Sequence, residues 1–320
     1  MNTKYSKYGA LVAIIAALFW GFSGCCSQYI FENYTVDAAH LTSFRMLSAG
    51  TIVVLAGFAA NVLKSRRPAK SGLPAKSDSP GDGPTSSMTA IWKDRSDVIQ
   101  LCIFAVFGIM LCQLSYQKAI YWTNSSTATI LQYTGPVLIM ALTCVMAHRL
   151  PTKKEVTAII LAMTGTFLLA THGDIHSMVL TPRGLFWGLF AAVTMVTYNM
   201  LPQRLIKKYG SMCVTGYGMV MGGIVLTIIT RAWEAAWPAD IRLWLAFGGV
   251  VLFGTVLSFT MFLWGVAQIG PVKASLIASL EPVAATVIMI FWLGSSFQIM
   301  DFVGFTCIFL TVFLLLKKES

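Results

Sequence analysis

Charged side chains are scarce in this chain of 320 residues, where Lys, Arg, Asp and Glu together make up 11% of the sequence. A soluble globular domain carries about 25% of them. So few charges cannot cover the surface of a soluble protein of this size, whereas 56% of the residues are apolar and 12% are aromatic. The composition therefore excludes a soluble enzyme, a soluble nucleic-acid-binding protein and a secreted disulfide scaffold. It predicts an integral membrane protein.

Cysteine is used sparingly, and its pattern does not suggest chemistry. None of the 7 cysteines belongs to a CxxC pair or to a Cys/His spacing that binds zinc, and all lie in apolar segments. They are Cys25, Cys26, Cys102, Cys112, Cys144, Cys213 and Cys307. The chain also lacks a Walker-type nucleotide-binding loop, so direct use of ATP is not expected. We expect no disulfide framework, no metal site and no cofactor.

Long apolar runs are what the sequence does contain. A helix needs about 20 predominantly apolar residues to cross the hydrocarbon core of a bilayer, and ten runs of roughly that length stand out. Their approximate limits are 8–31, 38–63, 98–120, 124–147, 155–172, 183–202, 212–230, 243–266, 271–293 and 298–316. These runs predict an all-α integral membrane protein with ten transmembrane helices.

The basic residues set the expected orientation, because Lys and Arg concentrate on the cytoplasmic side of membrane proteins. If the N-terminus lies inside, the outer loops contain only Arg183, Arg231 and Arg242 of the 23 basic residues. Residues 64–96 then lie inside; this stretch is rich in Pro, Gly and Ser and cannot bury enough apolar surface to order itself. We expect a flexible cytoplasmic linker there, and both termini on the cytoplasmic side of a bacterial plasma membrane.

The chain also carries a weak internal repeat. The matches are Gly108 with Gly254 and Pro136 with Pro282 at an offset of 146 residues, and Gln28 with Gln203 and Tyr34 with Tyr209 at an offset of 175. Each half holds five predicted spans, an odd number, so the second half must cross the bilayer in the opposite sense. Inverted repeats with a substrate site near the midplane are typical of secondary transporters. We predict two inverted five-helix repeats, 1–172 (including the linker) and 183–316, followed by a short cytoplasmic tail, 317–320.

Four short motifs carry a family resemblance: ALFWG in the first predicted span, SFRMLSAG in the second, and the paired LQYTGPV and IASLEPV in the fourth and ninth. In this order, and with the repeat, the chain resembles the EamA-type transporters of the drug/metabolite transporter superfamily over nearly its whole length except the linker. The resemblance implies a ten-helix transporter of small metabolites, with the fourth and ninth spans near a central cavity. The chain has His148-Arg149 and Gly294-Ser295 where that family often has Gly-Glu.

Two prolines lie near the middle of the fourth and ninth spans. Pro136 and Pro282 lack an N–H, which leaves the carbonyls of Gln132 and Ala278 without their helical partner. Freed carbonyls at mid-depth are tolerated where they line a wet cavity or meet protein donors. We therefore expect both prolines to bend their helices and to mark the lining of the cavity.

Two charged residues lie deep inside predicted spans, Glu281 near the middle of the ninth and Arg45 about two turns into the second, where each costs roughly 2.5–3.5 kcal/mol on insertion scales. Glu281 could bind an amine, carry a coupling proton, or form a structural pair with Arg45; the family pattern makes a structural role as good a candidate as a binding one. Arg45 could clamp a substrate carboxylate, or bind backbone carbonyls or Glu281. An Arg and a Glu that face one cavity would suit the two charges of an amino acid.

Further lining candidates are mid-span aromatic, amide and hydroxyl side chains. An aromatic side chain in a membrane helix more often packs than binds, whereas amides carry more weight because lipid offers them no hydrogen bond. With Arg45 and Glu281, the predicted substrate-binding set is completed by Trp20, Ser23, Gln113, Tyr116, Gln117, Gln132, Tyr133, Tyr198, Asn199, Tyr217, Trp264, Ser275 and Ser279.

The leading functional hypothesis is a secondary transporter, expected to be an exporter, of small organic metabolites such as amino acids or related amines. Its expected partners are a small-molecule substrate and membrane lipid, not nucleic acid; coupling to protons and the oligomeric state stay open. Nucleotide sugars and drugs are alternative cargoes.

The competing class is an integral-membrane enzyme that modifies a lipid or a small metabolite. His40 and His148 lie near opposite ends of spans, and no HExxH or GxSxG motif is present. His172, Asp174 and His176 could bind a metal, but a hydrated outer loop explains them more simply. We therefore predict no catalytic residue.

Overall fold

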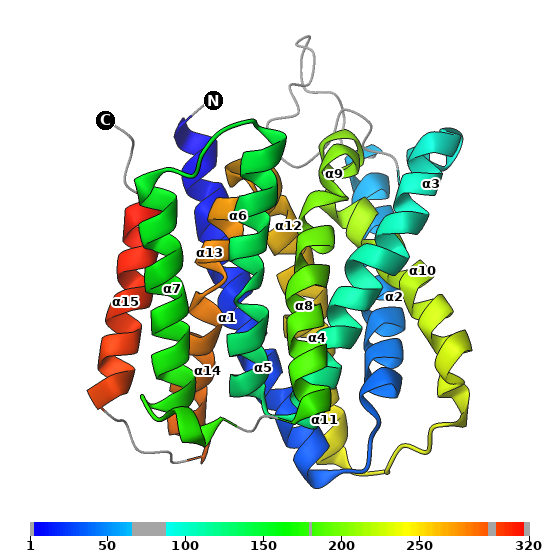
Figure 1. The fold of residues 1–320 in the computed structure, drawn as a ribbon. Coiled ribbons are helices and arrows are strands. Elements are labelled where there is room, and N and C mark those ends of the chain that lie inside the picture. Colours follow the sequence, from blue (N-terminus) through cyan, green and yellow to red (C-terminus); the bar gives the residue numbers. More distant parts are fainter. Residues whose placement is uncertain (1–2, 66–87, 179–180, 294–298, 317–320) are drawn as a thin grey trace.

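The computed structural model describes residues 3–65, 88–178, 181–293 and 299–316 (Figure 1). Every regular element in these ranges is a helix, which confirms the all-α class. The elements are α1 (Thr3–Asn33), α2 (Ala38–Ser65), η1 (Ala90–Lys93), α3 (Arg95–Ile103), η2 (Phe104–Met110), α4 (Leu111–Trp122), α5 (Ser125–Gln132), α6 (Gly135–Met146), α7 (Lys153–Thr171), η3 (Ile175–Ser177), α8 (Pro182–Met200), α9 (Gln203–Tyr209), α10 (Ser211–Thr230), η4 (Ala232–Glu234), α11 (Ile241–Val251), η5 (Leu252–Leu257), α12 (Ser258–Ile269), α13 (Pro271–Ile277), α14 (Leu280–Leu293) and α15 (Ile299–Leu316).

Within the described ranges, 9 helical stretches are long and apolar enough to cross a membrane, and Ile299–Leu315 is a shorter apolar helix. Most of their limits lie within a few residues of the predicted ones. The sixth stretch is longer than predicted, because α9 continues α8 after a turn at Leu201 and Pro202. Gln203 ties the two helices together by donating from Nε2 to the Asn199 carbonyl at 3.1 Å.

The predicted linker 64–96 is ordered at its C-terminal end, contrary to expectation. Residues 88–96 are described and include the short 3-10 helix η1. Met88 and Ile91 are buried, and Met88 packs over Gly57 of α2. These two apolar side chains anchor an otherwise polar stretch. Residues 66–87, the tail 317–320 and the Gly294-Ser295 pair lie outside the described residues.

The helices pack side by side in one bundle (Figure 1). The most extensive contacts join α2 to α10, α7 to α15, α4 to α8, and α1 to both α12 and α14. The pair α7 and α15 forms one edge of the bundle, and α10 lies at the opposite edge (Figure 1). Helix α1 therefore lies in the interior, where it contacts helices from the distant C-terminal half of the sequence.

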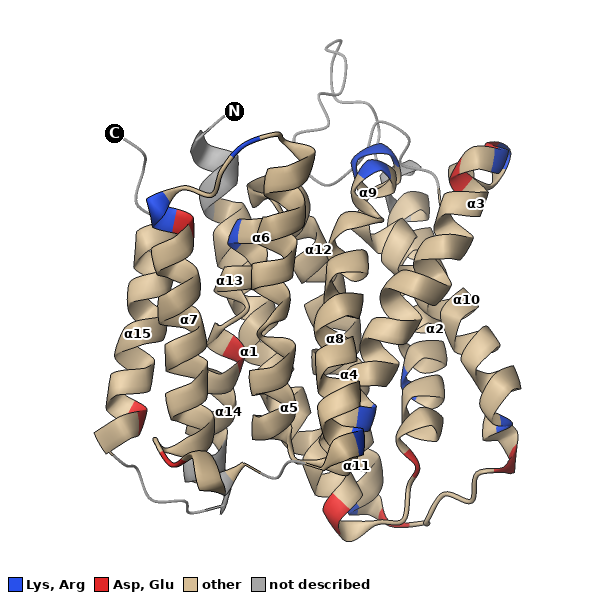
Figure 2. Cartoon of the chain, in the orientation of Figure 1, with Lys and Arg blue, Asp and Glu red and all other residues tan. Residues whose placement is uncertain are grey.

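Charged side chains gather at the two ends of the bundle (Figure 2). Most Lys and Arg side chains lie at the end where α1 begins and α15 ends, whereas most Asp and Glu side chains lie at the other (Figure 2). The long faces between the two ends are almost free of charge among the described residues. This distribution is the one expected of helices that cross a bilayer.

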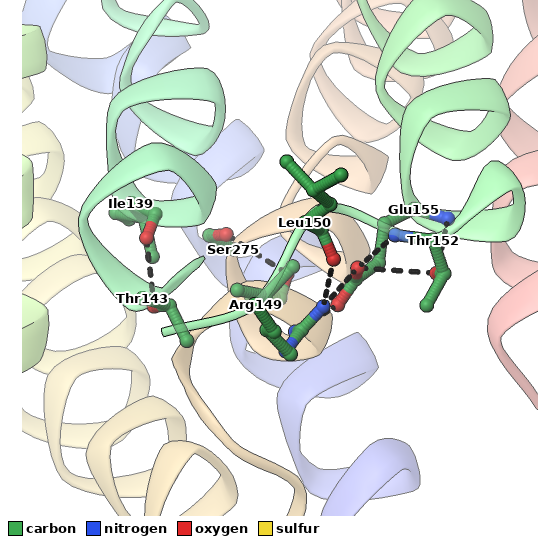
Figure 3. A network of polar contacts seen from close by, with 8 residues as sticks. Ile139, Thr143, Arg149, Leu150, Thr152, Glu155 and Ser275 are labelled. Carbon is green, nitrogen blue, oxygen red and sulfur yellow. Dashed lines mark hydrogen bonds and ion pairs between the residues drawn. The ribbon is translucent and has the colours of Figure 1, made fainter. Parts of the chain in front are cut away.

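The connection between α6 and α7 is closed by an ion pair (Figure 3). Arg149 donates from both terminal nitrogens to the Glu155 carboxylate, at 2.8 and 2.6 Å. Glu155 also completes a capping box with Thr152 at the start of α7. His148 has a φ of 49°, a conformation that favours glycine. The Gly of the resembled family would suit this backbone better than the His of this chain.

Close packing of α1 on α14 depends on Gly21. A methyl group at this position would collide with the Glu281 carbonyl oxygen and would lie 2.9 Å from the Ala285 nitrogen. Both atoms belong to the backbone, so neither can move aside without shifting α14. The glycine therefore sets the distance between α1 and the segment that carries Glu281.

We expect Gly21→Ala to destabilise the fold by about 1–3 kcal/mol, as overpacking does in other cores. The measurement is Tm in detergent micelles, followed by size-exclusion chromatography. Gly248→Ala is the matched control, because nothing lies within 4 Å of a methyl group at that position. Equal Tm values for the two variants would contradict this account of the α1–α14 contact.

Candidate functional site

A cavity with about 60 Å³ open to the centres of water molecules lies between helices from both halves of the chain. This space is large enough for a few water molecules, each of which needs about 10–15 Å³ on that measure. Its lining comprises Trp20, Ser23, Gly24, Ser27, Arg45, Cys112, Gln113, Tyr116, Gln117, Gln132, Tyr133, Met195, Tyr198, Phe259, Ala278 and Glu281. The site is thus built from segments that are remote in sequence and that meet only in the fold.

Most of the predicted substrate-binding residues line this cavity. They are Trp20, Ser23, Arg45, Gln113, Tyr116, Gln117, Gln132, Tyr133, Tyr198 and Glu281. The remaining ones are not among the described residues that line it, and their role in binding stays a prediction. They are Asn199, Tyr217, Trp264, Ser275 and Ser279.

The position of each of these five residues outside the lining has a local cause. Asn199 donates to the Met195 carbonyl of its own helix at 2.8 Å. Ser275 and Ser279 likewise donate to carbonyls one turn earlier, at 3.0 and 2.6 Å. Tyr217 packs edge-on against the Trp92 ring at 5.2 Å. Trp264 follows the lining residue Phe259 by five positions, which at 3.6 residues per turn directs it to another side of α12.

Sequence reasoning missed six lining residues, and the repeat could have found three of them. Met195 is the equivalent of Trp20 at an offset of 175, and Phe259 and Ala278 are the equivalents of Gln113 and Gln132 at an offset of 146. The other three are neighbours, on the same helices, of residues that were predicted: Gly24, Ser27 and Cys112. Each missed residue except Ser27 is apolar or weakly polar, so polarity gave no signal.

Both proline-containing helices break at the cavity. Helix α5 ends at Gln132 and α6 begins at Gly135, one residue before Pro136; α13 ends at Ile277 and α14 begins at Leu280, two residues before Pro282. We expected the Ala278 carbonyl to be free. Instead, it accepts a hydrogen bond from the Glu281 N–H at 2.8 Å. A tighter turn thus supplies the donor that the proline removed.

The second break places Glu281 in the first turn of α14, where the helix dipole favours an anion. The carboxylate is buried and accepts a hydrogen bond from the Tyr116 hydroxyl at 2.7 Å. That hydroxyl also lies 2.8 Å from Oγ1 of Thr129. Tyr116 of α4 therefore holds the carboxylate of α14 in place across the cavity.

Arg45 lies on α2 and is 4% exposed. Its Nε donates to Oγ1 of Thr255 at 3.2 Å, and Thr255 donates to the Val250 carbonyl at 2.8 Å. Among the described residues, no carboxylate forms an ion pair with Arg45, so the pair with Glu281 that the sequence left open is not formed. The two charges line the same cavity and are held by different partners.

Several other polar atoms of the lining have no partner among the described residues. Both amide atoms of Gln113 are buried without a hydrogen bond, as are Oε1 of Gln117 and the hydroxyl groups of Tyr133 and Tyr198. The other amide atom of Gln117, Nε2, donates to Oγ of Ser27 at 3.1 Å. Buried polar groups are almost always paired with protein or water. The unpaired atoms are therefore available to water or to a ligand in the cavity.

Comparison with known proteins assigns the family. A sequence profile described as the EamA-like transporter family matches residues 7–171 and 182–317. The chain belongs to the EamA-like transporter family. It is 34% identical over 315 residues to the uncharacterized inner membrane transporter YicL of Salmonella typhimurium, with 98% of this chain and 97% of that protein covered. It is 25% identical over 223 residues to the uncharacterized transporter YyaM of Bacillus subtilis, with 68% and 73% covered.

A protein of known crystal structure shares the fold of this EamA-like chain. The two align with a TM-score of 0.71 over 96% of this chain and 95% of the other, at 15% sequence identity. Together with the apolar helices, the family and its transporter relatives make this protein a multi-pass integral membrane transporter. The cavity is accordingly the candidate site for its cargo.

We expect Thr255→Val in this EamA-like transporter to lower the free energy of unfolding by about 1.5–3 kcal/mol, because the Arg45 guanidinium loses a buried acceptor. The measurement is Tm in detergent micelles. Thr286→Val is the matched control: Thr286 donates only to the Pro282 carbonyl of its own helix, at 2.8 Å. An equal loss in both variants would show that Thr255 does not support Arg45.

Proposed function

We propose that this protein is a secondary transporter that exports small organic metabolites, such as amino acids or related amines, across a bacterial plasma membrane. The observation that carries the proposal is the pair of buried charges, Arg45 and Glu281, which line one cavity without pairing with each other. A zwitterion offers a carboxylate to the first and an ammonium group to the second. Two charged side chains that do not pair with each other are costly in free energy inside a bilayer, unless water or a ligand fills the cavity that they line.

The proposed architecture has ten transmembrane helices in two inverted five-helix repeats, 1–172 and 183–316. The packing pattern supports it: α1 packs against α12 and α14, and the equivalent α8 packs against α4, α5 and α6. Two π-helices, η2 and η5, occupy equivalent places in the two halves. The breaks before Pro136 and Pro282 are equivalent as well. A scaffold of two like halves can expose one central cavity to either side in turn.

The proposed orientation places both termini in the cytoplasm. The Lys- and Arg-rich end of the bundle is the end where α1 begins and α15 ends (Figure 2). Positive charge is retained on the cytoplasmic side during membrane insertion. The opposite, acidic end would then face the exterior.

The lining favours amino acids or amines over the alternative cargoes. Arg45 is the one cationic residue among the described residues that line the cavity. A nucleotide sugar carries two linked phosphates, for which several cations or a helix N-terminus would be expected. A hydrolytic membrane enzyme is disfavoured as well, because within the described part of the chain no histidine lines the cavity to serve as a base for Ser23, Ser27 or Cys112.

Alternating access needs the charges to be neutralised while the cavity is closed. In the proposed cycle the substrate ammonium group binds Glu281 while Tyr116 keeps the carboxylate oriented, and the substrate carboxylate binds the terminal nitrogens of Arg45. When the cavity returns empty, a proton on Glu281 would serve the same purpose as the ammonium group. Proton coupling is therefore part of the proposal and is tested with it.

The test is uptake of a labelled panel of amino acids and amines into proteoliposomes, with and without a proton gradient. We expect saturable uptake by the wild type and at least a tenfold loss in Glu281→Gln and in Arg45→Gln, because truncating a buried charge partner costs about 2–5 kcal/mol. Coupling predicts that the gradient stimulates the wild type but not Glu281→Gln.

The matched controls are Glu155→Gln and Arg149→Gln, which remove a carboxylate and a guanidinium from the α6–α7 turn, outside the cavity. Both should transport at the wild-type rate. Absence of uptake of every panel member by folded wild-type protein would rule out this class of cargo. Normal uptake by both cavity variants would remove Arg45 and Glu281 from the site.

A further inference from the structure

The two repeats contribute residues of opposite polarity at equivalent positions of the cavity. The third and eighth spans align without a gap at an offset of 146 residues. The aligned pairs are Gln113 with Phe259, Tyr116 with Phe262, Gln117 with Leu263 and, in the fourth and ninth spans, Gln132 with Ala278. A chain with two identical halves would have a cavity that is equally polar on both sides. This chain does not.

The α4 side of the cavity is polar and incompletely hydrogen-bonded. Gln113, Tyr116 and Gln117 all line the cavity from this helix. Tyr116 is bonded to Glu281 at 2.7 Å, whereas the Gln113 amide and the Gln117 carbonyl oxygen have no partner among the described residues. The unsatisfied atoms require a polar group in the cavity.

The α12 side of the cavity is aromatic. Phe259 lines it and packs edge-on against Trp20 and Tyr198, with both ring centroids at 5.3 Å. Phe262 lies behind, fully buried, with its ring centroid 4.7 Å from that of Trp20. Met195 adds a further apolar side chain to the lining. The rings of this surface can bury an apolar body, and its unpaired polar atoms among the described residues are the Tyr198 hydroxyl and Nε1 of Trp20.

We infer that the substrate is an amphiphile that binds in one orientation, with its charged end at α4 and its apolar body against Phe259, Trp20 and Tyr198. Gln113 and Phe259, which occupy equivalent positions of the two repeats, are the specificity-determining residues for the two ends. This inference rests on the proposed transport function and narrows its cargo to molecules with a sizeable apolar part.

The two charged residues of the cavity have uncharged equivalents in the other repeat. This difference between the repeats supports a single orientation of the substrate. The repeat equivalent of Glu281 is Gly135, and that of Arg45 at an offset of 175 is Val220. Gly135 is tightly packed: a methyl group there would lie 2.9 Å from the Met195 sulfur and 3.2 Å from the Ala192 carbonyl oxygen. Reversing the substrate would place its charged end among aromatic rings and leave the amides unpaired.

The experiment compares a series with one charged end and a growing apolar body: glycine, alanine, valine, leucine and phenylalanine, each labelled and taken up into proteoliposomes. For the wild type we expect kcat/KM to rise along the series. Phe259→Leu should lower kcat/KM for phenylalanine by about tenfold relative to glycine, the scale on which a hydrophobic pocket discriminates. Gln113→Leu should lower kcat/KM for all members of the series by a common factor.

Two controls separate specificity from folding. Phe262→Leu makes the same change one turn along α12, behind the lining, and Ser115→Ala changes a buried residue of α4 that contacts Thr194 at 3.0 Å instead of the cavity. Both should leave the ranking of the series unchanged. If Phe259→Leu elutes as aggregate in size-exclusion chromatography, Phe259→Met replaces it.

Uptake by the wild type that is equal along the series, or a Phe259→Leu variant that lowers all members alike, would overturn this inference and leave the proposed function standing. Saturable uptake of other amino acids or amines of the panel, with none of this series, would likewise overturn this inference alone. No saturable uptake of the series or of any other panel member by folded wild type would overturn both.

Discussion

Polar groups inside a bilayer find no hydrogen-bond partners in the lipid, and this constraint shapes the molecule described here. Most polar side chains of the spans, such as Ser275 and Ser279, meet it within their own helix by donating to a nearby carbonyl. Arg45 and Glu281 cannot, because a full charge needs a partner from elsewhere. Their burial is tolerated because other helices supply Thr255 and Tyr116, and because a cavity gives access to water or cargo.

The irregular parts of the helices are what bring those partners into position. In the π-helix η5, the side-chain hydroxyl of Thr255 donates to the Val250 carbonyl five residues earlier, and its oxygen accepts from Arg45. Single-turn π-helices in α-helices frequently occur at functional sites. The break before Pro282 starts a new helix, whose first turn carries Glu281. A regular α-helix through either segment would direct these side chains differently.

The two halves of the chain share a scaffold but have diverged where they meet the cavity. Gly21 allows α1 to lie directly on the backbone that carries Glu281, so the helices that form the site are held close. On this scaffold the α4 side carries amides and the α12 side carries aromatic rings. Divergence of this kind keeps the pairwise packing of the helices while it changes which ligand the space between them accepts.

The sequence alone determined the helical class, the positions of most spans and the family, because the length of an apolar run must match the bilayer and because short motifs kept their order. It also identified much of the lining, because a polar residue in the middle of a span finds no hydrogen-bond partner in lipid and is therefore a candidate for the wall of a cavity. It could not tell that Tyr133 and Gln113 line the cavity whereas Tyr217 and Asn199 are not in its lining. Sequence position gives depth in the membrane, but only the packing of distant helices decides which side of a helix faces the cavity, whether a polar group is satisfied locally, and that Arg45 meets Thr255 instead of Glu281.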